Sequence, residues 1–325
     1  MTGATAFWVD GPGAGALRDE DIPEPGGDDV LVRTLYTGIS RGTESVVFRG
    51  GVPVSERGRM RAPFQAGEFP GPVKYGYLNV GVVEQGDPTL VGRTVFALYP
   101  HQSAFVVPSS KVFVVPDDVP PRRAVLAGAV ETAVNVLWDA APLVGDRVGV
   151  IGAGMIGCSV ARLLRGIPGL DVVLVDVDGS KAAVADRLGV AFAHPDDAPR
   201  DRDLAIDVSG AEAGLQVALE SVVTEGEVIE ASWFGDRAVR LDLGGAFHSR
   251  RLTIRSSQVG MVSPRRRGTR TTGDRLALAL RLLSDPAFDA LLTGSSPWRE
   301  LPAVMAAVAD GSSTGLCHTI DWRAA

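Results

Sequence analysis

The sequence predicts an α/β protein in which a six-stranded, doubly wound parallel sheet follows a β-rich N-terminal part, and two observations lead to this class. An apolar run over residues 148–151 ends at Gly152, Gly154 and Gly157, which have GxGxxG spacing, and a helical pattern follows. A second apolar run ends at Asp176, an acid 19 residues after Gly157. Glycines with this spacing and an acid at this distance are typical of a Rossmann sheet that binds a dinucleotide.

The second half of the chain keeps this alternation of strand and helix. Short apolar runs separated by helical patterns predict parallel strands joined by right-handed crossovers. The predicted strands are 148–151, 172–176, 190–193, 204–208, 227–231 and 252–255. The predicted helices between them are 155–164, 180–188 and 213–222. Six strands suit two mononucleotide-binding halves.

The N-terminal part is rich in β-branched and aromatic runs that Gly, Pro and Asp clusters separate, as in a set of short strands. The predicted strands are 30–37, 80–84, 94–98 and 105–107. A boundary is expected at 116–121, and a helix follows over 124–140.

The last part of the chain predicts an amphipathic helix over 275–283, a helix over 303–309 and a strand over 317–322. The segment 263–273 is rich in Arg, Thr and Gly and predicts a solvated loop. A phosphate contact by its three consecutive arginines is the alternative, and these are Arg265, Arg266 and Arg267.

The composition indicates an ordinary soluble globular chain. Of 325 residues, 45% are hydrophobic and 22% charged, and the net charge of -7 disfavours nucleic acid as a partner. No run reaches the length of a membrane span, and no secretory signal is expected at the N-terminus. The two cysteines, Cys158 and Cys317, exclude a disulfide framework and favour a cytoplasmic location, with both thiols as packing residues.

Several segments together resemble the medium-chain dehydrogenase/reductase superfamily. They are 37–44, 74–83, 92–96, 131–133, the glycine loop and Asp176. Within it, Ser-Arg-Gly-Thr-Glu at 40–44 and Lys-Tyr-Gly-Tyr at 74–77 look like the branch that contains bacteriochlorophyllide dehydrogenase. The resemblance implies a GroES-like barrel from residues 1–117 plus 288–325, a Rossmann domain over 118–287, and an active site in the cleft between them. It also implies a small-molecule substrate and a homodimer formed near residues 252–255.

The three positions at which zinc-dependent members of this superfamily carry metal ligands hold other residues here. Ser40 stands in place of the cysteine, Tyr77 in place of the histidine, and Gly128 at the third position if Thr132 is the threonine that meets the nicotinamide. Zinc sites need thiolate, imidazole or carboxylate ligands, so we expect no catalytic zinc. Convergence of His101 with Glu131 is the alternative metal cluster that the sequence leaves open.

Without a metal, other groups must move the hydroxyl proton and stabilise the developing oxyanion. Tyr77 is the first candidate, with a core tyrosine as the alternative. Lys74 either lowers the pKa of this phenol or lies on the surface. His101, on a predicted loop, is either a proton carrier or incidental.

A predicted turn after the strand at 30–37 carries three more candidates. Thr43 is the nearest match to the hydroxyl relay that the family carries after its first ligand position. Arg41 could grip a carboxylate or phosphate of the substrate, or could instead pair with Glu44.

The dinucleotide is expected along the glycine loop and the strand ends. Asp176 should bind the adenosine ribose, and no basic residue directly follows it, so NAD is predicted over NADP. The resemblance adds residues beside the ribose and the nicotinamide half. The full set is Gly152, Gly154, Met155, Ile156, Gly157, Asp176, Val177, Lys181, Thr132, Ser209, Ser232 and Ser257.

Three functions are compatible with these residues. The first is a zinc-independent oxidoreductase that transfers a hydride between NAD(H) and a secondary alcohol or ketone. The second is an NADPH-dependent enone or quinone reductase, which also needs no metal but is disfavoured by Asp176. The third is a non-catalytic NAD(H)-binding module.

Overall fold

The computed structural model describes residues 2–323 and divides into two compact units. The first unit contains the described residues up to Gly128 together with Leu280–Ser284 and the described residues from Leu292 onward. The second unit contains Ala129–Ala279 and Asp285–Leu291. Within the described residues, no helix combines the length and the apolar character that a membrane crossing requires.

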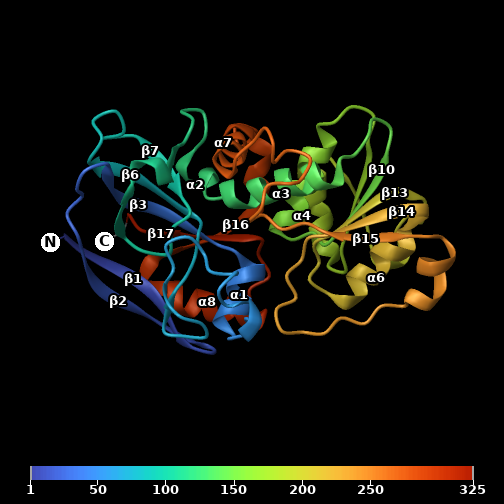
Figure 1. Ribbon diagram of the computed structural model, residues 1–325, viewed down its shortest axis with the longest axis horizontal. Coiled ribbons are helices and arrows are strands. Elements are labelled where there is room, and N and C mark those ends of the chain that lie inside the picture. Colours follow the sequence, from blue (N-terminus) through green and yellow to red (C-terminus); the bar gives the residue numbers. More distant parts are fainter. Residues whose placement is uncertain (1, 324–325) are drawn as a thin grey trace. The chain divides into compact units, whose positions relative to one another are not determined.

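The second unit is built on a six-stranded parallel sheet, which confirms the predicted doubly wound class (Figure 1). Its strands are β10 (Arg147–Ile151), β11 (Asp171–Val175), β12 (Ala191–Ala193), β13 (Arg202–Asp207), β14 (Val222–Glu230) and β15 (Thr253–Ser256). Their spatial order is β12-β11-β10-β13-β14-β15, and every pair is parallel. The order reverses between β10 and β13, and ligands of such sheets bind at this switch point, outside the carboxyl ends of the strands.

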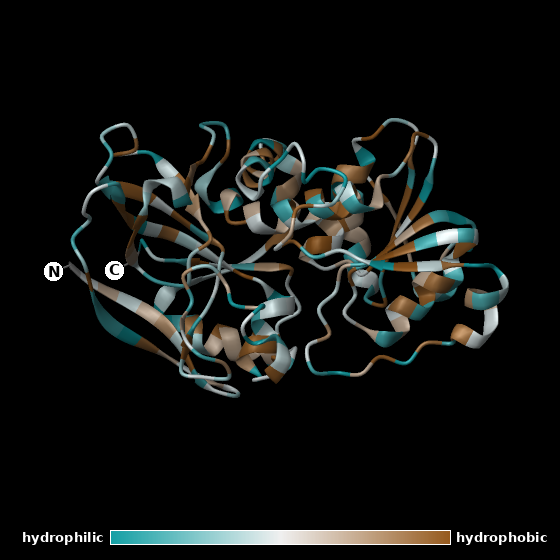
Figure 2. Ribbon diagram, in the orientation of Figure 1, coloured by the Kyte–Doolittle hydropathy of each residue, from teal (hydrophilic) through white to brown (hydrophobic). Residues whose placement is uncertain are grey.

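Helices connect and cover these strands. They are α3 (Ala127–Ala140), α4 (Met155–Arg165), α5 (Ala182–Leu188), α6 (Glu212–Ser221) and α7 (Thr272–Leu282). The strongly amphipathic α4 buries Cys158, Ala161 and Leu164. The central strands are coloured mainly as hydrophobic in Figure 2, because a parallel strand covered on both faces has no solvent-facing side.

The helix predicted over 124–140 is interrupted in the structure. A short α2 (Pro121–Ala124) precedes α3, and the N–H of Leu126 donates to the carbonyl of Arg123 across three residues instead of four. This tighter turn separates the two helices.

The first unit contains two further sheets. One has the order β2-β1-β5-β4, and the other has the order β16-β17-β3-β6-β7-β9, with β8 also paired to β3. The strands are β1 (Thr2–Gly11), β2 (Ala14–Ile22), β3 (Asp29–Ile39), β4 (Ala66–Gly67), β5 (Val73–Lys74), β6 (Asn79–Gln85), β7 (Thr94–Ala97), β8 (Ala104–Pro108), β9 (Val112–Val114), β16 (Leu292–Pro297) and β17 (Cys317–Asp321). The predicted strands of this part are thus present.

Two features of the first unit differ from the prediction. The hairpin of β1 and β2 was not predicted, because β2 is largely polar and exposed and lacks an alternating apolar face. The expected turn carrying Arg41, Thr43 and Glu44 is a helix, α1 (Arg41–Phe48), which buries Val46, Val47 and Phe48. Burial of this apolar stretch explains why the chain continues as a helix after β3.

The remaining helices are α8 (Leu301–Asp310) in the first unit and a set of short helical segments of three to six residues. These segments are η1 (Val54–Glu56), η2 (Ser109–Lys111), η3 (Gly179–Lys181), η4 (Pro195–Asp197), η5 (Leu243–Phe247), η6 (Pro286–Leu291) and η7 (Trp298–Glu300). The α8 helix connects the parallel strands β16 and β17, and β17 pairs antiparallel with β3. The last described strand therefore completes a sheet begun near the N-terminus.

Candidate active site

The glycine loop after β10 has the geometry of a dinucleotide site. Gly152 has φ +103°, and a Cβ there would lie 2.7 Å from the Cα of Ser209. A Cβ at Gly157 would lie 1.8 Å from the carbonyl oxygen of Gly152, so only glycine allows α4 to pack this closely on the loop. A Cβ at Gly154 would meet nothing within 4 Å. The space in front of Gly154 is therefore open, as a pyrophosphate requires.

The start of α4 faces this open space. Gly154 is its N-cap, and no side chain caps the helix. The first N–H groups of a helix have no partner within it, and together with the helix dipole they attract an anion. Met155, Ile156 and Gly157 form this first turn.

Asp176 lies directly after β11, and its carboxylate reaches the glycine loop. Its Oδ2 accepts a hydrogen bond from the N–H of Ala153 at 2.6 Å, and its Oδ1 accepts one from the N–H of Asp178 at 2.8 Å. Val177 is 75% exposed, and the Nζ of Lys181 lies 3.4 Å from Asp178. Two carboxylates and one paired lysine therefore surround the expected ribose position.

The three predicted serines follow three neighbouring strands, β13, β14 and β15, at the carboxyl edge of the sheet. The Oγ of Ser232 accepts from the N–H of Gly210 at 3.0 Å. Ser257 instead turns its hydroxyl to α3, where it donates to Asp139 at 2.6 Å. Thr132 also lies on α3 and is partly exposed. We call the three glycines, Asp176 and the turn at Ser209 the dinucleotide cradle, because the open space at Gly154 and a carboxylate beside the glycine loop fit that ligand.

In the first unit, Ser40 and Tyr77 lie together. The Tyr77 hydroxyl donates to the Oγ of Ser40 at 2.7 Å. At the third family ligand position, a Cβ on Gly128 would lie 2.5 Å from Leu78, so a larger residue does not fit without a shift of that side chain. Within residues 2–323, no three His, Cys, Asp or Glu side chains are grouped as metal ligands. Serine, tyrosine and glycine at these positions do not fit a zinc ion.

A chain of buried hydrogen bonds lies behind this pair. The Oε1 of Glu44 accepts from the N–H of Ser40 at 2.7 Å, and its Oε2 lies 2.8 Å from the Nε2 of His101. The Nδ1 of His101 lies 2.7 Å from the Oγ1 of Thr37, which also accepts from the indole N–H of Trp322 at 3.0 Å. As a carboxylate Glu44 only accepts, so His101 donates through Nε2.

We call these six side chains the polar cluster: Thr37, Ser40, Glu44, Tyr77, His101 and Trp322. The side chain of His101 is 1% exposed, and both of its ring nitrogens have partners. Glu131, the second residue of the alternative metal cluster, lies in the other unit. It binds the guanidinium of Arg275 at 3.0 Å.

The electrostatics of Tyr77 differ from the prediction. Burial and the nearby Glu44 raise the pKa of Tyr77 to about 12, although hydrogen bonds with Ser40 and Thr43 act in the opposite direction. Lys74 does not lower it, because its Nζ pairs with Glu20 at 2.6 Å and with Gln102 at 2.7 Å. Lys74 is also buried, which corrects the surface interpretation. The Tyr77 phenol is therefore protonated at neutral pH.

Arg41 does not pair with Glu44. Its Nη1 donates to the carbonyl of Gly315 at 3.4 Å, while Ser40 and His101 occupy both oxygens of Glu44. Thr43, on the same helix, is partly exposed and reaches the Tyr77 hydroxyl.

Four residues of these sites were not predicted from the sequence. Thr37 and Trp322 join the polar cluster from positions 285 residues apart, and nothing local indicates that they meet. Asp207 and Glu230 occupy the last positions of β13 and β14 beside the cradle. A polar residue ending a buried apolar strand is a signal that could have identified this second pair.

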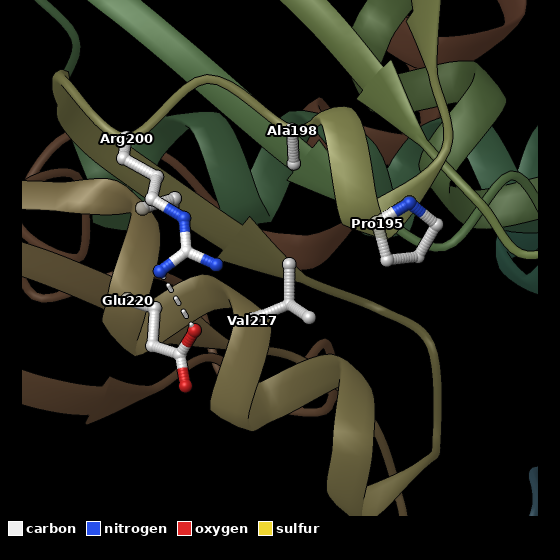
Figure 3. Close-up of a pocket in the computed structure, with 6 residues that line it drawn as sticks. Pro195, Ala198, Arg200, Val217 and Glu220 are labelled. Atoms are coloured by element: carbon white, nitrogen blue, oxygen red, sulfur yellow. Dashed lines mark ion pairs between the residues drawn. The ribbon is translucent and has the colours of Figure 1, made fainter.

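A separate hollow, drawn in Figure 3, lies at the other edge of the sheet. Arg200 precedes β13, Ser221 precedes β14, and Arg200 pairs across the hollow with Glu220 at 3.2 Å. Pro195, Ala198 and Val217 complete its lining. Because Arg200 and Ser221 precede strands and ligands of such sheets bind outside the carboxyl ends, we do not assign this hollow to the active site.

No protein-family model matches the chain. L-threonine 3-dehydrogenase of Mesorhizobium japonicum is 37% identical over 120 residues, which cover 35% of this chain and 33% of the relative. The starvation-sensing protein RspB of Escherichia coli K12 is 25% identical over 191 residues, which cover 51% of this chain and 55% of the relative. The chain thus spans about a third to a half of the length of these curated relatives.

Solved structures match over nearly the whole chain. L-idonate 5-dehydrogenase of Escherichia coli K-12 has a TM-score of 0.80 at 15% identity, with 98% of each chain covered. The alcohol dehydrogenase rspB of Escherichia coli CFT073, complexed with NADH, has a TM-score of 0.75 at 16% identity, with 99% of this chain and 100% of that chain covered. A dehydrogenase of Sinorhizobium meliloti 1021 bound to NADP has a TM-score of 0.78 at 17% identity, with 99% and 100% covered.

The low identities restrict the structural comparison to the fold. That fold is a Rossmann sheet with a GroES-like unit, as predicted. The names of the relatives support an oxidoreductase and support the resemblance to medium-chain dehydrogenase/reductases.

Proposed function

We propose that this protein is a medium-chain dehydrogenase/reductase that transfers a hydride between NAD(H) and a secondary alcohol or ketone without a catalytic zinc. The observation that carries the proposal is the Tyr77–Ser40 hydrogen bond, formed by the residues that replace two metal ligands. A hydroxyl pair at this place can handle the proton that a zinc-bound oxygen would otherwise exchange.

The cradle supports a dinucleotide, and its charges favour NAD. When bound, the nicotinamide supplies or accepts the hydride. The open face of Gly154 leaves room for the pyrophosphate, and Asp176, which lies against the glycine loop, would accept hydrogen bonds from ribose hydroxyls. A 2′-phosphate would meet the carboxylates of Asp176 and Asp178, and the lysine nearby is already paired with Asp178.

Tyr77 serves as the proton donor in the reduction direction. Its raised pKa keeps the phenol protonated, so it can donate to the carbonyl oxygen on which negative charge develops. Ser40 and Thr43 then stabilise the phenolate, since their hydrogen bonds lower the pKa of this group. Glu44 and His101 position Ser40 through its backbone N–H.

The proposal gives Arg41 a role in binding the substrate. The partly exposed Arg41 would bind an anionic group on the substrate, because guanidinium matches carboxylate and phosphate geometry.

The proposal also includes a homodimer. The strand β15 is an edge strand of the parallel sheet, and pairing of two such edges would form the dimer. Light scattering of the purified protein tests the dimer, and a monomer mass at assay concentration contradicts it.

The test is turnover of NADH with a panel of ketones, comparing Tyr77→Phe with Tyr75→Phe. Tyr75 is a matched control because it is a buried neighbouring tyrosine whose pKa burial also raises. We expect kcat to fall by about 10²–10⁴-fold in Tyr77→Phe, the usual contribution of a proton donor, and to change little in Tyr75→Phe. Metal analysis of active protein should find no stoichiometric zinc.

The outcomes separate the alternatives. Full activity in Tyr77→Phe would overturn the assignment of the proton donor. Strong NADPH preference with reduction of enones would indicate an alkene reductase instead. Binding of NADH without turnover across a broad carbonyl panel would indicate a non-catalytic module.

A further inference from the structure

Two carboxyl groups, Asp207 and Glu230, lie side by side at the carboxyl edge of the parallel sheet. They end β13 and β14 and occupy the same register position, so their side chains leave the same face of the sheet. Asp207 is completely buried, and Glu230 is partly exposed. Each also accepts from the turn that follows it: the N–H of Ser209 donates to Asp207 at 3.1 Å, and the N–H of Ser232 donates to Glu230 at 2.5 Å.

The other oxygen of each group faces no ordinary donor. Within the described residues, the Oδ2 of Asp207 and the Oε2 of Glu230 are buried and meet no N–H or hydroxyl donor. The two carboxyls are neighbours in register, and each acts on the pKa of the other. Two carboxylates only accept, so a hydrogen bond between them requires a proton on one of them.

In the part of the chain that the structure describes, the residues in register with the pair and the helix residue against it carry no compensating charge. The residues in register on the flanking strands are Ile151 of β10 and Ser256 of β15, and Gly214 of α6 lies against Asp207. Burial and then Asp207 raise the pKa of Glu230 to about 8, and burial raises the pKa of Asp207. Like charges this close do not both ionise easily at neutral pH.

The turns that follow the pair reach the cradle. The Oγ of Ser232 accepts from the N–H of Gly210 at 3.0 Å, which ties the two turns together. The backbone of Ser209 lies so close to Gly152 that a Cβ on that glycine would be 2.7 Å from it. A change in the spacing of the turns is therefore transmitted directly to the glycine loop.

We propose that one proton shared by Asp207 and Glu230 holds the turns after β13 and β14 together and thereby positions the glycine loop for the dinucleotide. This role rests on the proposed function, because it concerns the same dinucleotide site. Both side chains are positioning residues and act through Ser209 and Ser232. Loss of the proton places two negative charges in contact, which separates the turns and weakens binding.

The first experiment measures the unfolding free energy against pH without any dinucleotide. The folded state holds the proton up to about pH 8, whereas an unfolded glutamate releases it near its usual pKa of 4.5. The folded state therefore binds more protons in this window, and stability falls as pH rises through it. In Glu230→Gln the amide donates to Asp207 at every pH, so this part of the fall disappears.

Glu227→Gln is the matched control. It makes the same change on the same strand, but Glu227 pairs with Arg255 at 2.8 Å and does not contact the shared proton. We expect this control to be offset from the wild type by a constant amount across the window. A pH dependence in Glu230→Gln that parallels the wild type overturns the shared proton.

The second experiment measures NADH binding by fluorescence between about pH 6.5 and pH 9. We expect wild-type affinity to fall about tenfold, the equivalent of one pKa unit, and Glu230→Gln to vary less than about twofold. Equal pH dependence in both proteins overturns the positioning role but leaves the proposed function intact. Failure of the wild type to bind NADH or NADPH at any pH overturns the proposed function and the positioning role, while the stability profile still decides whether the proton is shared.

Discussion

The dinucleotide cradle consists mainly of glycine and backbone, whereas the polar cluster consists of side chains. The cradle uses the absence of Cβ atoms at Gly152 and Gly157 to bring the loop, α4 and Ser209 into contact. The polar cluster uses one carboxylate, Glu44, to join a backbone N–H to an imidazole. Substitution in the cradle should therefore alter ligand affinity, and substitution in the cluster should first alter the stability of the fold.

The largest expected effect is in the cluster, from His101→Ala. It leaves the Oε2 of Glu44 buried without its partner, and breaking a buried pair in this way costs about 3–5 kcal/mol. Urea denaturation measures this loss. His194→Ala, at a histidine whose side chain is 45% exposed, is the control and should change stability by less than about 0.5 kcal/mol. If both variants lost the same free energy of unfolding, the polar cluster would contribute no more to stability than an exposed residue. Its contrast with the cradle would then fail.

The next largest effect is expected in the cradle, where Gly154→Ala should weaken the binding of NADH. A new methyl group would occupy the space expected for the pyrophosphate, so NADH affinity should fall by about a hundredfold, or about 2.7 kcal/mol. The free protein should lose less than about 1 kcal/mol, because the methyl group meets no atom there. Calorimetric titration and thermal melting measure the two quantities. A variant that binds normally would contradict the assigned role of Gly154.

A smaller change should follow from Asp176→Asn. Removing one charge lessens repulsion of a 2′-phosphate while the amide keeps hydrogen bonding, so the NADPH-to-NADH affinity ratio should rise by about tenfold. Parallel titrations with the two dinucleotides measure the ratio. Val177→Ala, at an exposed uncharged neighbour, is the control and should leave it unchanged.

The smallest expected effect concerns Ser40→Ala. It removes one hydrogen bond to the Tyr77 hydroxyl, a contribution of about 1 kcal/mol, so kcat should fall about fivefold. In a Tyr77→Phe background the same change should have no further effect, because the two hydroxyls act together. Independent effects in this double-mutant cycle would show that Ser40 acts apart from Tyr77.

The two regions also differ in how far the sequence predicts them. The cradle lies within contiguous segments whose glycine spacing, strand ends and acid are visible in order, and the six predicted strands all form one parallel sheet. The same reasoning placed Ser40 and Tyr77 at positions of a missing metal and listed Glu44 as a candidate on the turn that follows. It could not show that Glu44 binds His101, since 57 residues separate them.

Local pattern was also insufficient where side chains are polar and buried. Lys74 had a surface interpretation because lysine is seldom buried, but Glu20 from an unpredicted hairpin compensates its charge. The prediction that Lys74 lowers the pKa of the Tyr77 phenol was wrong for the same reason, because it required Lys74 to face Tyr77. Both errors arise because the partner of a buried polar side chain comes from a distant part of the chain. Residue type and local spacing do not identify that partner.

The pairing of β17 with β3 has a consequence for synthesis of the protein. The indole of Trp322 and the strand before it complete the first unit by bonding to β3 and to Thr37, which is translated 285 residues earlier. On a ribosome, the parallel sheet can close while these residues are still untranslated, whereas the earlier unit must wait with one edge of β3 uncovered. Chaperone demand during translation should therefore concentrate on the segment around β3, one edge of which stays uncovered until β17 is made.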